Sequence, residues 1–404
     1  MIIEGKYTKA KIFAQNIDET ALEQLKKIVD HPSFTNSISI MPDVHAGASN
    51  AVIGFTMPLT DSVIPNTVGV DIGCGMVACK LNKKINKEDL PQLDKKIRQI
   101  IPIGNSKGGV NKNSVIDFKK KFDFEKANNF LHLFAKKFKN VFGRQYTEIE
   151  YSYNWFEMLC KRIDAEQQYI ENSLCSLGGG NHFIEVGTDS QTGANWLTIH
   201  TGSRQLGKLV ADFHSKIAKN KCKANVPKQM EFLTDQEMYN YFVDMIFVQV
   251  YASLNRKFIM EKILEILKTE KIDFIESTHN YIDFEDMIIR KGAISSYTGK
   301  RMIIPFNMAD GILICEGKSN KEWNFSAPHG AGRILSRTKA IEQLDLKKFE
   351  KIMKEKNIYT TSVSKSTLDE SPMAYKPADE IEKAIENTAK VLFKIKPTYN
   401  LKSA

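Results

Sequence analysis

The sequence predicts a fold built from both α-helices and β-strands, because it carries two kinds of apolar periodicity. Short apolar runs next to glycine and other turn-forming residues, at residues 183–186, 196–199 and 303–314, are typical of β-strands. A much longer apolar run at residues 239–267 has the spacing of an α-helix. With 404 residues, the chain is long enough for one large domain or about two to three smaller ones.

The first part of the chain predicts a strand, a helix and a second strand over residues 8–40. The helix is indicated by an apolar stripe at Ala21, Leu22, Leu25, Ile28 and Val29. Further on, Val68 and Val70 alternate with Gly69 and run into Asp71. We therefore expect a short buried strand here, ending in a glycine-rich turn.

The remainder alternates between the two kinds of element. Residues 84–170 are lysine-rich and mostly helical in pattern, and residues 210–271 are also helical. Between them lie the strands at 183–186 and 196–199, and a helix is expected directly after His200. Residues 303–314 predict a strand, a turn and a strand. The tail predicts a turn and then a helix from Asp379 to Phe393.

Composition and charge narrow the classes of function. No run of about 18 apolar residues occurs, so no transmembrane helix is expected. The N-terminal residues carry charges where a signal peptide needs an apolar segment. The six cysteines include no CxxC pair, which fits a reduced, cytoplasmic compartment. The formal charge of +9 suits a polyanionic partner such as RNA.

Five side chains form a candidate metal site. Asp71 and Cys74 are three residues apart, and Gly73 and Gly75 on either side of the thiol allow close approach to the backbone. A carboxylate and a thiolate on one loop can bind a divalent cation; a buried structural cysteine beside a turn aspartate is the alternative. Imidazole ligands are supplied by His182, His200 and His279. The set suffices for one well-filled metal position or two partly open ones.

Glycine-rich turns next to polar side chains indicate phosphate binding. Three glycines at 178–180 precede Asn181, and the backbone N–H groups of such a turn can bind a phosphate. A hairpin turn would have the same pattern. The helix that starts after His200, with Ser203 and Arg204 at its N-terminus, offers a second anion site.

His329 is a candidate nucleophile. A neutral imidazole nitrogen can attack phosphorus, and His329 stands before a Gly-Ala-Gly-Arg segment that we expect to open a helix. Gly330 and Gly332 would let backbone amides reach a phosphate, and Arg333 could offset its charge. A helix-capping histidine in a glycine turn is the alternative. His45, on a loop, is either solvated or a secondary site residue.

The lysine-rich segment, residues 84–170, is a candidate RNA-binding surface. Residues 118–124 and 134–142 interleave aromatic and basic side chains. Aromatic side chains packed inward would leave the lysines facing phosphates. The alternative is a solvated helix face that covers a core.

Long motifs that contain glycine and histidine recur along the chain. They are VGVDIGCG, LGGGNHFIEV, IHTGSRQLG, the His279-Asn280 pair, PHGAGRILSR, AYKPADEIEKAI and KIKPTYNLK. In this order they resemble the RtcB family of RNA ligases, from about residue 8 to the end and most weakly between 84 and 170. The resemblance implies a single domain over residues 1–404 with an α+β fold. In it, mixed and antiparallel sheets pack with helices around a central metal and nucleotide cleft.

The resemblance also implies an activity. A member of this family is expected to use GTP and two Mn²⁺ ions to join RNA 3′-phosphate or 2′,3′-cyclic phosphate ends to 5′-hydroxyl ends. The histidine is guanylylated, GMP passes to the RNA 3′-phosphate, and the 5′-hydroxyl then displaces GMP. Such an enzyme serves RNA repair or tRNA splicing, and an archease-like protein is a candidate activator. No membrane partner is expected.

The resemblance assigns roles to residues of this sequence. Cys74 is similar to the thiolate that bridges both ions, and Asp71, His182, His200 and His279 are similar to the other ligands. His329 is similar to the nucleophile. The residues similar to the guanylate-binding segments are Asn181, His182, Phe183, Ile184, Glu185, His279, Asn280, Pro305, Phe306, Asn307, Met308, His329, Gly330, Ala331, Gly332 and Lys402.

The sequence departs from the common family pattern in the guanylate-binding segments and the tail. Phe306-Asn307 stands where the commoner form has Gly-Ser, Ile312 replaces a serine, and the tail continues past Lys402. These departures predict a divergent branch, dedicated to RNA repair. Two alternatives remain. One is a metal-dependent phosphoesterase or nuclease without a covalent nucleotide, and the other is a catalytically silent RNA-binding protein.

Overall fold

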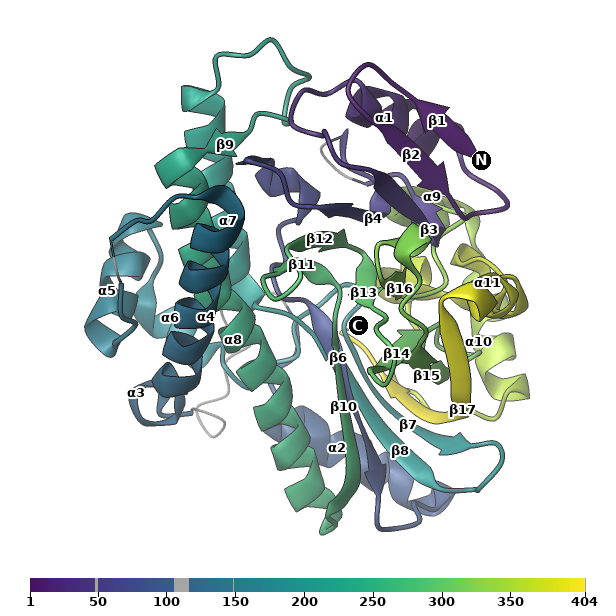
Figure 1. Cartoon of the computed structure of the whole chain (residues 1–404). Helices are drawn as coiled ribbons and strands as arrows, with labels where there is room; N and C mark the ends of the chain where they lie inside the picture. The colour runs from purple at the N-terminus through teal and green to yellow at the C-terminus, as the bar shows by residue number, and fades with distance from the viewer. Residues whose placement is uncertain (48–49, 105–115, 148, 404) are drawn as a thin grey trace.

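Two large β-sheets and one long helix form the centre of the computed structural model, which describes residues 1–47, 50–104, 116–147 and 149–403 (Figure 1). The larger sheet has seven strands in the order β10-β6-β8-β7-β17-β15-β14, and all neighbouring pairs are antiparallel. Its strands are β6 (Gly75–Leu81), β7 (Phe183–Asp189), β8 (Asn195–Thr201), β10 (Lys271–Thr278), β14 (Arg301–Pro305), β15 (Ile312–Gly317) and β17 (Ala389–Leu401).

The two edge strands of this sheet approach each other. The backbone N–H of Ile303 on β14 donates to the Ser277 hydroxyl on β10 at 3.0 Å. Beside it, Arg301 Nη2 donates to Asp273 Oδ1 at 2.7 Å. The sheet therefore curls toward a barrel.

The second sheet has six strands in the order β1-β2-β3-β4-β12-β11. Only β2 and β3 are parallel in it. Its strands are β1 (Ile2–Glu4), β2 (Lys9–Ile12), β3 (Ile38–His45), β4 (Ile53–Pro58), β11 (Asn280–Asp283) and β12 (Ile288–Lys291). Two small antiparallel pairs are β13 (Ala293–Ser295) with β16 (Ser326–Pro328), and β5 (Ser62–Val63) with β9 (Leu233–Thr234).

Helices surround the sheets (Figure 1). They are α1 (Glu19–Val29), α2 (Leu90–Ile100), α3 (Phe118–Lys121), α4 (Phe124–Phe142), α5 (Tyr153–Arg162), α6 (Gln167–Asn172), α7 (Arg204–Lys221), α8 (Asp235–Leu267), α9 (Arg337–Gln343), α10 (Leu346–Glu355) and α11 (Ala378–Ala384). The α+β architecture of antiparallel and mixed sheets packed with helices is confirmed.

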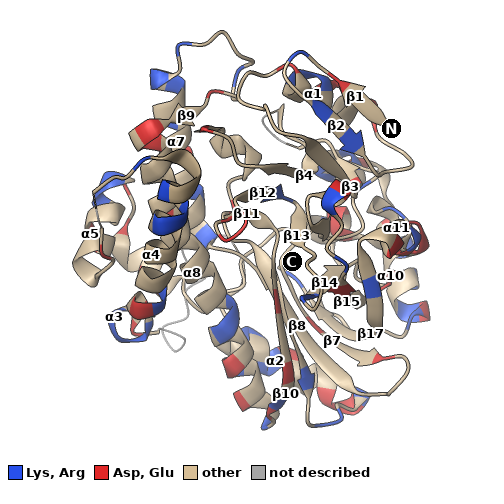
Figure 2. Cartoon of the chain, in the orientation of Figure 1, with Lys and Arg blue, Asp and Glu red and all other residues tan. Residues whose placement is uncertain are grey.

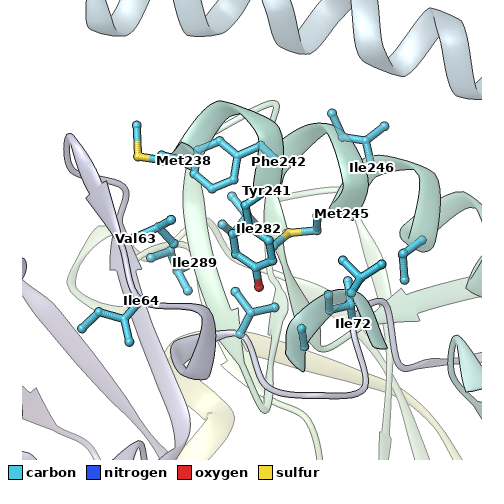
Figure 3. Packing of buried hydrophobic residues seen from close by; sticks show 14 of the residues in the cluster. Val63, Ile64, Ile72, Met238, Tyr241, Phe242, Met245, Ile246, Ile282 and Ile289 are labelled. Carbon is cyan, nitrogen blue, oxygen red and sulfur yellow. The ribbon is translucent and has the colours of Figure 1, made fainter. Parts of the chain in front are cut away.

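Helix α8 is apolar around most of its circumference because it is covered on several sides. Figure 3 shows its Met238 and Phe242 beside Val63 and Ile289 of the smaller sheets. Burial of side chains of this size removes a large apolar area from water, so α8 is the centre of the largest core cluster. The helix predicted at residues 239–267 is confirmed and is longer than expected.

The lysine-rich segment is helical in its described part, as predicted, and its residues 105–115 and 148 lie outside the described residues. Phe118, Phe122, Phe134 and Phe138 are buried against α8 and its neighbours, whereas the lysines between them are largely exposed. Figure 2 shows Lys and Arg on the outer helices and a mostly uncharged centre. The aromatic side chains thus form core, and the role of the lysines stays a prediction.

The strand, helix and strand predicted over residues 8–40 are confirmed as β2, α1 and β3. Two other predictions are wrong. Residues 68–70 form a turn, because Gly69 has φ +97° and Val70 is 51% exposed; the strand β6 begins only at Gly75. The tail helix ends at Ala384, and residues 389–393 begin β17, where lysines alternate with apolar side chains at the period of a strand.

Among the helices of the described residues, none combines the length and the apolar character that a bilayer-spanning segment needs. Each of the six cysteines is a free thiol.

The core around α4 gives a stability prediction. Phe134 is 1% exposed and stacks on Tyr239, with ring centroids 5.4 Å apart. Phe134→Ala should lower the free energy of unfolding by about 3–5 kcal/mol, because it removes buried area and leaves a cavity. Leu133→Ala is the matched control: Leu133 is 62% exposed, and its loss should change the free energy by less than about 0.5 kcal/mol. Urea denaturation followed by circular dichroism measures both, and equal effects would contradict the packing described.

Candidate active site

One rim of the seven-stranded sheet collects the candidate metal ligands. Gly75, at the start of β6, is paired with Thr201 at the end of β8 and with Thr278 at the end of β10. On the next strand, Phe183 at the start of β7 is opposite His200. Residues adjacent to these strand ends therefore meet at the rim. The predicted ligands occupy these places, since each lies at one of the strand ends or within a few residues of it: Asp71, Cys74, His182, His200 and His279.

The ligand atoms of these five residues lie within a few ångströms of one another. Cys74 Sγ is 3.5 Å from Nε2 of His182 and 3.4 Å from Nε2 of His200. Nε2 of His200 is 3.3 Å from Nε2 of His279. Asp71 Oδ2 is 3.1 Å from Nε2 of His182. The structure thus brings together the whole set that the sequence predicted, here named the ligand cluster.

Backbone carbonyls fix the orientation of two of the rings. Leu177 O accepts from Nδ1 of His182 at 3.0 Å, and Asn181 O accepts from Nδ1 of His200 at 3.2 Å. A ring that donates from Nδ1 presents the lone pair of Nε2. Burial also lowers the pKa values of His200 and His279 well below the usual range for histidine, which keeps both rings neutral.

The donor set fits a divalent transition metal. Three imidazole nitrogens, one sulfur and one carboxylate oxygen lie within a few ångströms of one another, and such a mixed set of N, S and O donors can bind a divalent transition metal. Burial, with the charge of Asp71, raises the pKa of the Cys74 thiol well above its usual range, so a thiolate needs a cation beside it. Cysteine and histidine also suit Zn²⁺, so the donors alone do not select Mn²⁺.

Asp71 is bound by the N-terminus of α7. The backbone N–H and the hydroxyl of Ser203 donate to its Oδ1 at 3.1 and 3.3 Å. A Cβ atom on Gly202 would lie 2.1 Å from the same oxygen, so only glycine fits there. Burial opposes ionisation, but the neighbouring His182, the Cys74 thiol and Arg204 hold the pKa of Asp71 well below its usual range. The anion at this predicted helix N-terminus is therefore Asp71.

A cavity of about 950 Å³ opens beside the ligand cluster. Most of the predicted guanylate-binding residues line it: Asn181, Phe183, Glu185, His279, Asn280, Pro305, Phe306, Asn307, Met308, His329, Gly330, Ala331, Gly332 and Lys402. Two do not line the cavity. Ile184 is fully buried in the core, and the His182 ring belongs to the ligand cluster.

His329 is oriented by a buried carboxylate. Asp43 on β3 is fully buried, and its Oδ2 accepts from Nδ1 of His329 at 2.7 Å and from the backbone N–H of His329 at 3.2 Å. The His329 ring lies 4.8 Å from the ring of His279, measured between centroids. With Nδ1 donating to Asp43, the neutral tautomer of His329 would carry its lone pair on Nε2, as the predicted nucleophile requires.

The part of the cavity around Lys402 holds two buried carboxylates. Glu185 Oε2 accepts from Asn400 at 2.8 Å, while Oε1 has no hydrogen-bond donor among the described residues. Burial raises the pKa of Glu185 to about 8, although the bond from Asn400 lowers it. Glu370 binds Lys402 Nζ at 2.9 Å; burial opposes its ionisation, but Lys402 and Arg337 lower its pKa to about 2. The cavity wall around Lys402 therefore offers both hydrogen-bond acceptors and a cation.

Sequence reasoning missed several of these residues and misplaced others. Asp43 and Asn400 carried a signal, since Asp43 is two residues before His45 and Asn400 lies in the motif that ends at Lys402, but Glu370 carried none. His329 does not open a helix, because residues 330–336 are irregular and α9 begins at Arg337. The side chain of Arg333 turns away from His329 to bond the Tyr375 hydroxyl at 3.0 Å and to stack on its ring.

Two other sequence features take their places in the cavity wall. His45 lines the cavity and contacts Asp43 O through Nδ1 at 2.9 Å, and burial lowers its pKa to about 4. The departures Phe306, Asn307 and Ile312 also line it. Asn307 Oδ1 accepts from the backbone N–H of Ala309 at 2.9 Å and so closes a turn at the cavity mouth.

The ligand cluster gives a prediction about Cys74. Titration with Co²⁺ should give a thiolate-to-cobalt charge-transfer band, and Cys74→Ser should abolish it, because the sulfur lies among the Nε2 atoms. Cys79→Ser is the matched control, since Cys79 is buried on β6, five residues after Cys74, but contacts Met260 in the core. A band that persists in Cys74→Ser would exclude this sulfur as a ligand.

The chain is similar to known RNA ligases along nearly its whole length. The family model described as "tRNA-splicing ligase RtcB" matches residues 24–403. The chain is 29% identical to the RNA-splicing ligase RtcB of Escherichia coli (strain K12), with 94% of this chain and 93% of that protein covered. It is 26% identical to the tRNA-splicing ligase RtcB of Nanoarchaeum equitans, with 98% and 94% covered. The chain belongs to the RtcB family.

Proposed function

We propose that this protein is an RNA ligase that uses GTP and Mn²⁺ to join RNA 3′-phosphate or 2′,3′-cyclic phosphate ends to 5′-hydroxyl ends. The reaction has two covalent intermediates, guanylylated His329 and an RNA whose 3′-phosphate carries GMP. The observation that carries the proposal is that His329, in the wall of a large cavity beside the ligand cluster, is held through Nδ1 by buried Asp43 at 2.7 Å. Family membership supports RNA as the substrate.

The chemistry of His329 follows from its hydrogen bond. The Nε2 lone pair attacks the α-phosphorus of GTP, a P–N bond forms, and the bond to pyrophosphate breaks. The Nδ1 proton stays on the ring, where Asp43 offsets the positive charge that develops. An oxygen of the RNA 3′-phosphate then attacks the same phosphorus, and neutral His329 leaves. A cyclic end is first hydrolysed to the 3′-monophosphate. Finally the 5′-hydroxyl attacks the RNA phosphate and GMP leaves.

The ligand cluster supports a pair of divalent cations. When bound, these ions would supply positive charge to the phosphate oxygens. The chain supplies the neutral rings of His200 and His279, the carboxylate held by Ser203, and the sulfur of Cys74. Because the cluster lies beside His329, with His279 in contact with both, a phosphate bound there would be within reach of the nucleophile.

The part of the cavity around Lys402 supports a guanine. The Watson–Crick edge of guanine has N–H donors and a carbonyl acceptor, whereas this part of the wall has the acceptor Glu185 and the donor Lys402. Lys402 also lies over the Phe183 ring, 5.3 Å from its centroid. The departures Phe306, Asn307 and Ile312 line the same cavity and support a divergent binding mode. The protein proposed here is an RNA-repair enzyme of the cytoplasm, with an archease-like protein as its candidate activator.

A metal-dependent phosphoesterase or nuclease is the second candidate, because buried cysteine and histidine ligands suit Zn²⁺ as well. Such an enzyme needs no oriented nucleophilic histidine. Labelling with α-³²P-GTP in the presence of Mn²⁺ separates the two, since only the ligase becomes covalently labelled.

We expect an acid-labile, alkali-stable GMP adduct on the wild-type protein and none on His329→Ala, because a P–N bond to imidazole has that stability pattern. His329→Ala should still join RNA that already carries the 3′-guanylate, since this substrate bypasses the covalent step. His132→Ala is the control and should label normally, because His132 is exposed on α4. An adduct that survives in His329→Ala, or that maps to a lysine, would overturn the assignment.

The exposed lysines of α3 and α4 give a prediction about RNA binding. Neutralising them should weaken RNA binding and flatten its salt dependence by about 0.7–0.9 in log–log slope for each phosphate that a lysine no longer neutralises. The residues to change are Lys119, Lys120, Lys121, Lys136, Lys137 and Lys139. GTP labelling should be unaffected, since α4 packs on α8 and lines no part of the cavity. An unchanged slope in filter-binding titrations would identify these lysines as a solvated helix face.

A further inference from the structure

We propose that Asn255 and Arg256, two adjacent residues in the middle of α8, are positioning residues that hold the ligand cluster in its metal-binding geometry. No sequence motif singles them out, since they lie within a long apolar helix. Both are almost fully buried, although both are polar. A buried polar side chain in an apolar helix needs partners, and the partners of these two are the segments that carry the ligands. The inference rests on the proposed metal site.

The guanidinium of Arg256 hydrogen-bonds to three of these segments, two through Nη1 and the third through Nε and Nη2. Its Nη1 donates to Gly73 O at 2.8 Å, next to Cys74, and to Thr201 O at 3.0 Å, next to His200. Its Nε and Nη2 donate to Glu276 Oε1 at 3.2 and 2.8 Å. Glu276 lies on β10, three residues before His279. One guanidinium thus connects three ligand-bearing segments with fixed, planar geometry.

Asn255 binds the fourth segment. Its Oδ1 accepts from the backbone N–H of Ser176 at 3.0 Å, and its Nδ2 donates to Ser176 O at 3.0 Å and to Gly202 O at 3.1 Å. Ser176 precedes Leu177, whose carbonyl orients the His182 ring and also accepts from the Thr201 hydroxyl at 2.7 Å. The amide of Asn255 therefore fixes the carbonyl that sets the direction of His182.

The helix also contacts the Cys74 loop directly. Gly73 has φ +75°, and a Cβ atom on it would lie 3.1 Å from Ala252 Cβ and 3.1 Å from Gln249 Cα. Residues 249, 252 and 256 are three and four positions apart, so they share one face of α8. The loop that carries Cys74 therefore packs against this face of α8. Because the two backbones are so close, Gly73 O lies within hydrogen-bond distance of Arg256.

These contacts matter because the ligands come from segments that are distant in sequence. Residues 71–74, 182, 200 and 279 have no common element of their own, yet all four segments hydrogen-bond to positions 255 and 256, directly or through Glu276, Ser176 and Leu177. Residues that orient metal ligands commonly change metal affinity by about 10–100-fold when they are replaced. The role assigned here is to hold the ligands in place, since neither side chain lines the cavity.

The test uses Arg256→Lys in the full chain. Lysine keeps the charge beside Glu276, but one ammonium cannot span Gly73 O, Thr201 O and Glu276 in the guanidinium geometry. We expect Mn²⁺ affinity, measured from the electron paramagnetic resonance signal of free Mn²⁺, to fall by about tenfold or more. The thermal midpoint in chelator should stay within a few degrees of wild type. Lys257→Arg is the matched control, because Lys257 is exposed one position further on the same helix, and its affinity should be unchanged.

The outcomes are distinct. A lower midpoint with unchanged Mn²⁺ affinity would make Arg256 a purely structural residue and overturn the inference. Failure of the wild-type chain to bind Mn²⁺ would overturn the proposed metal site itself, and the inference with it. If Arg256→Lys does not fold, Glu276→Gln is tested by the same two measurements, because the Glu276 side chain is 29% exposed and the change removes the charge that pairs with Arg256.

Discussion

The candidate site depends on the strand register at one rim of the seven-stranded sheet. Gly75 faces Thr201 and Thr278 there, and this alignment brings the residues next to three strand ends to a common point. A shift of one residue along a strand would turn every side chain of that strand to the opposite face. Gly202, which leaves room for Asp71, and Gly73, which lies against α8, add steric conditions that only glycine meets. The ligand geometry is therefore a property of the sheet as a whole.

The sequence predicted which side chains meet at the candidate site better than it predicted the local geometry. Glycine-rich motifs mark the five candidate ligands and His329, and the structure brings all of them together. The strand expected at residues 68–70 failed because alternation of valine and glycine does not distinguish a strand from a turn with positive φ. The helix expected up to Phe393 was wrong in its second half, because the lysines there fit the period of a helix and that of a strand. Pairing with β7 and β15 makes this segment a strand. Asp43 and Arg256 act through contacts between distant segments, which sequence spacing does not encode.

Three buried carboxylates around the cavity differ in what surrounds them. Asp43 accepts two hydrogen bonds from His329 and so holds its ring. Glu370 is surrounded by Lys402, Arg333 and Arg337 and remains ionised at neutral pH. Glu185 has one oxygen without a donor among the described residues, and burial raises its pKa into the neutral range. The neighbours of each carboxylate thus decide its role: Asp43 orients a histidine ring, Glu370 is an ion-paired anion, and Glu185 has an oxygen free to bind a ligand.

The position of β17 has a consequence for the order in which the protein can form. This strand lies between β7 and β15, yet the ribosome makes it after both of them, since it comprises residues 389–401. Until it is made, β7 and β15 each present an unpaired edge, which is a template for pairing with other chains. The same strand ends beside Lys402 and carries Asn400, so the edge is covered and the cavity wall is completed in one event. A nascent chain is therefore exposed to aggregation for as long as it lacks its site, and a truncated one has neither a closed sheet nor a complete cavity.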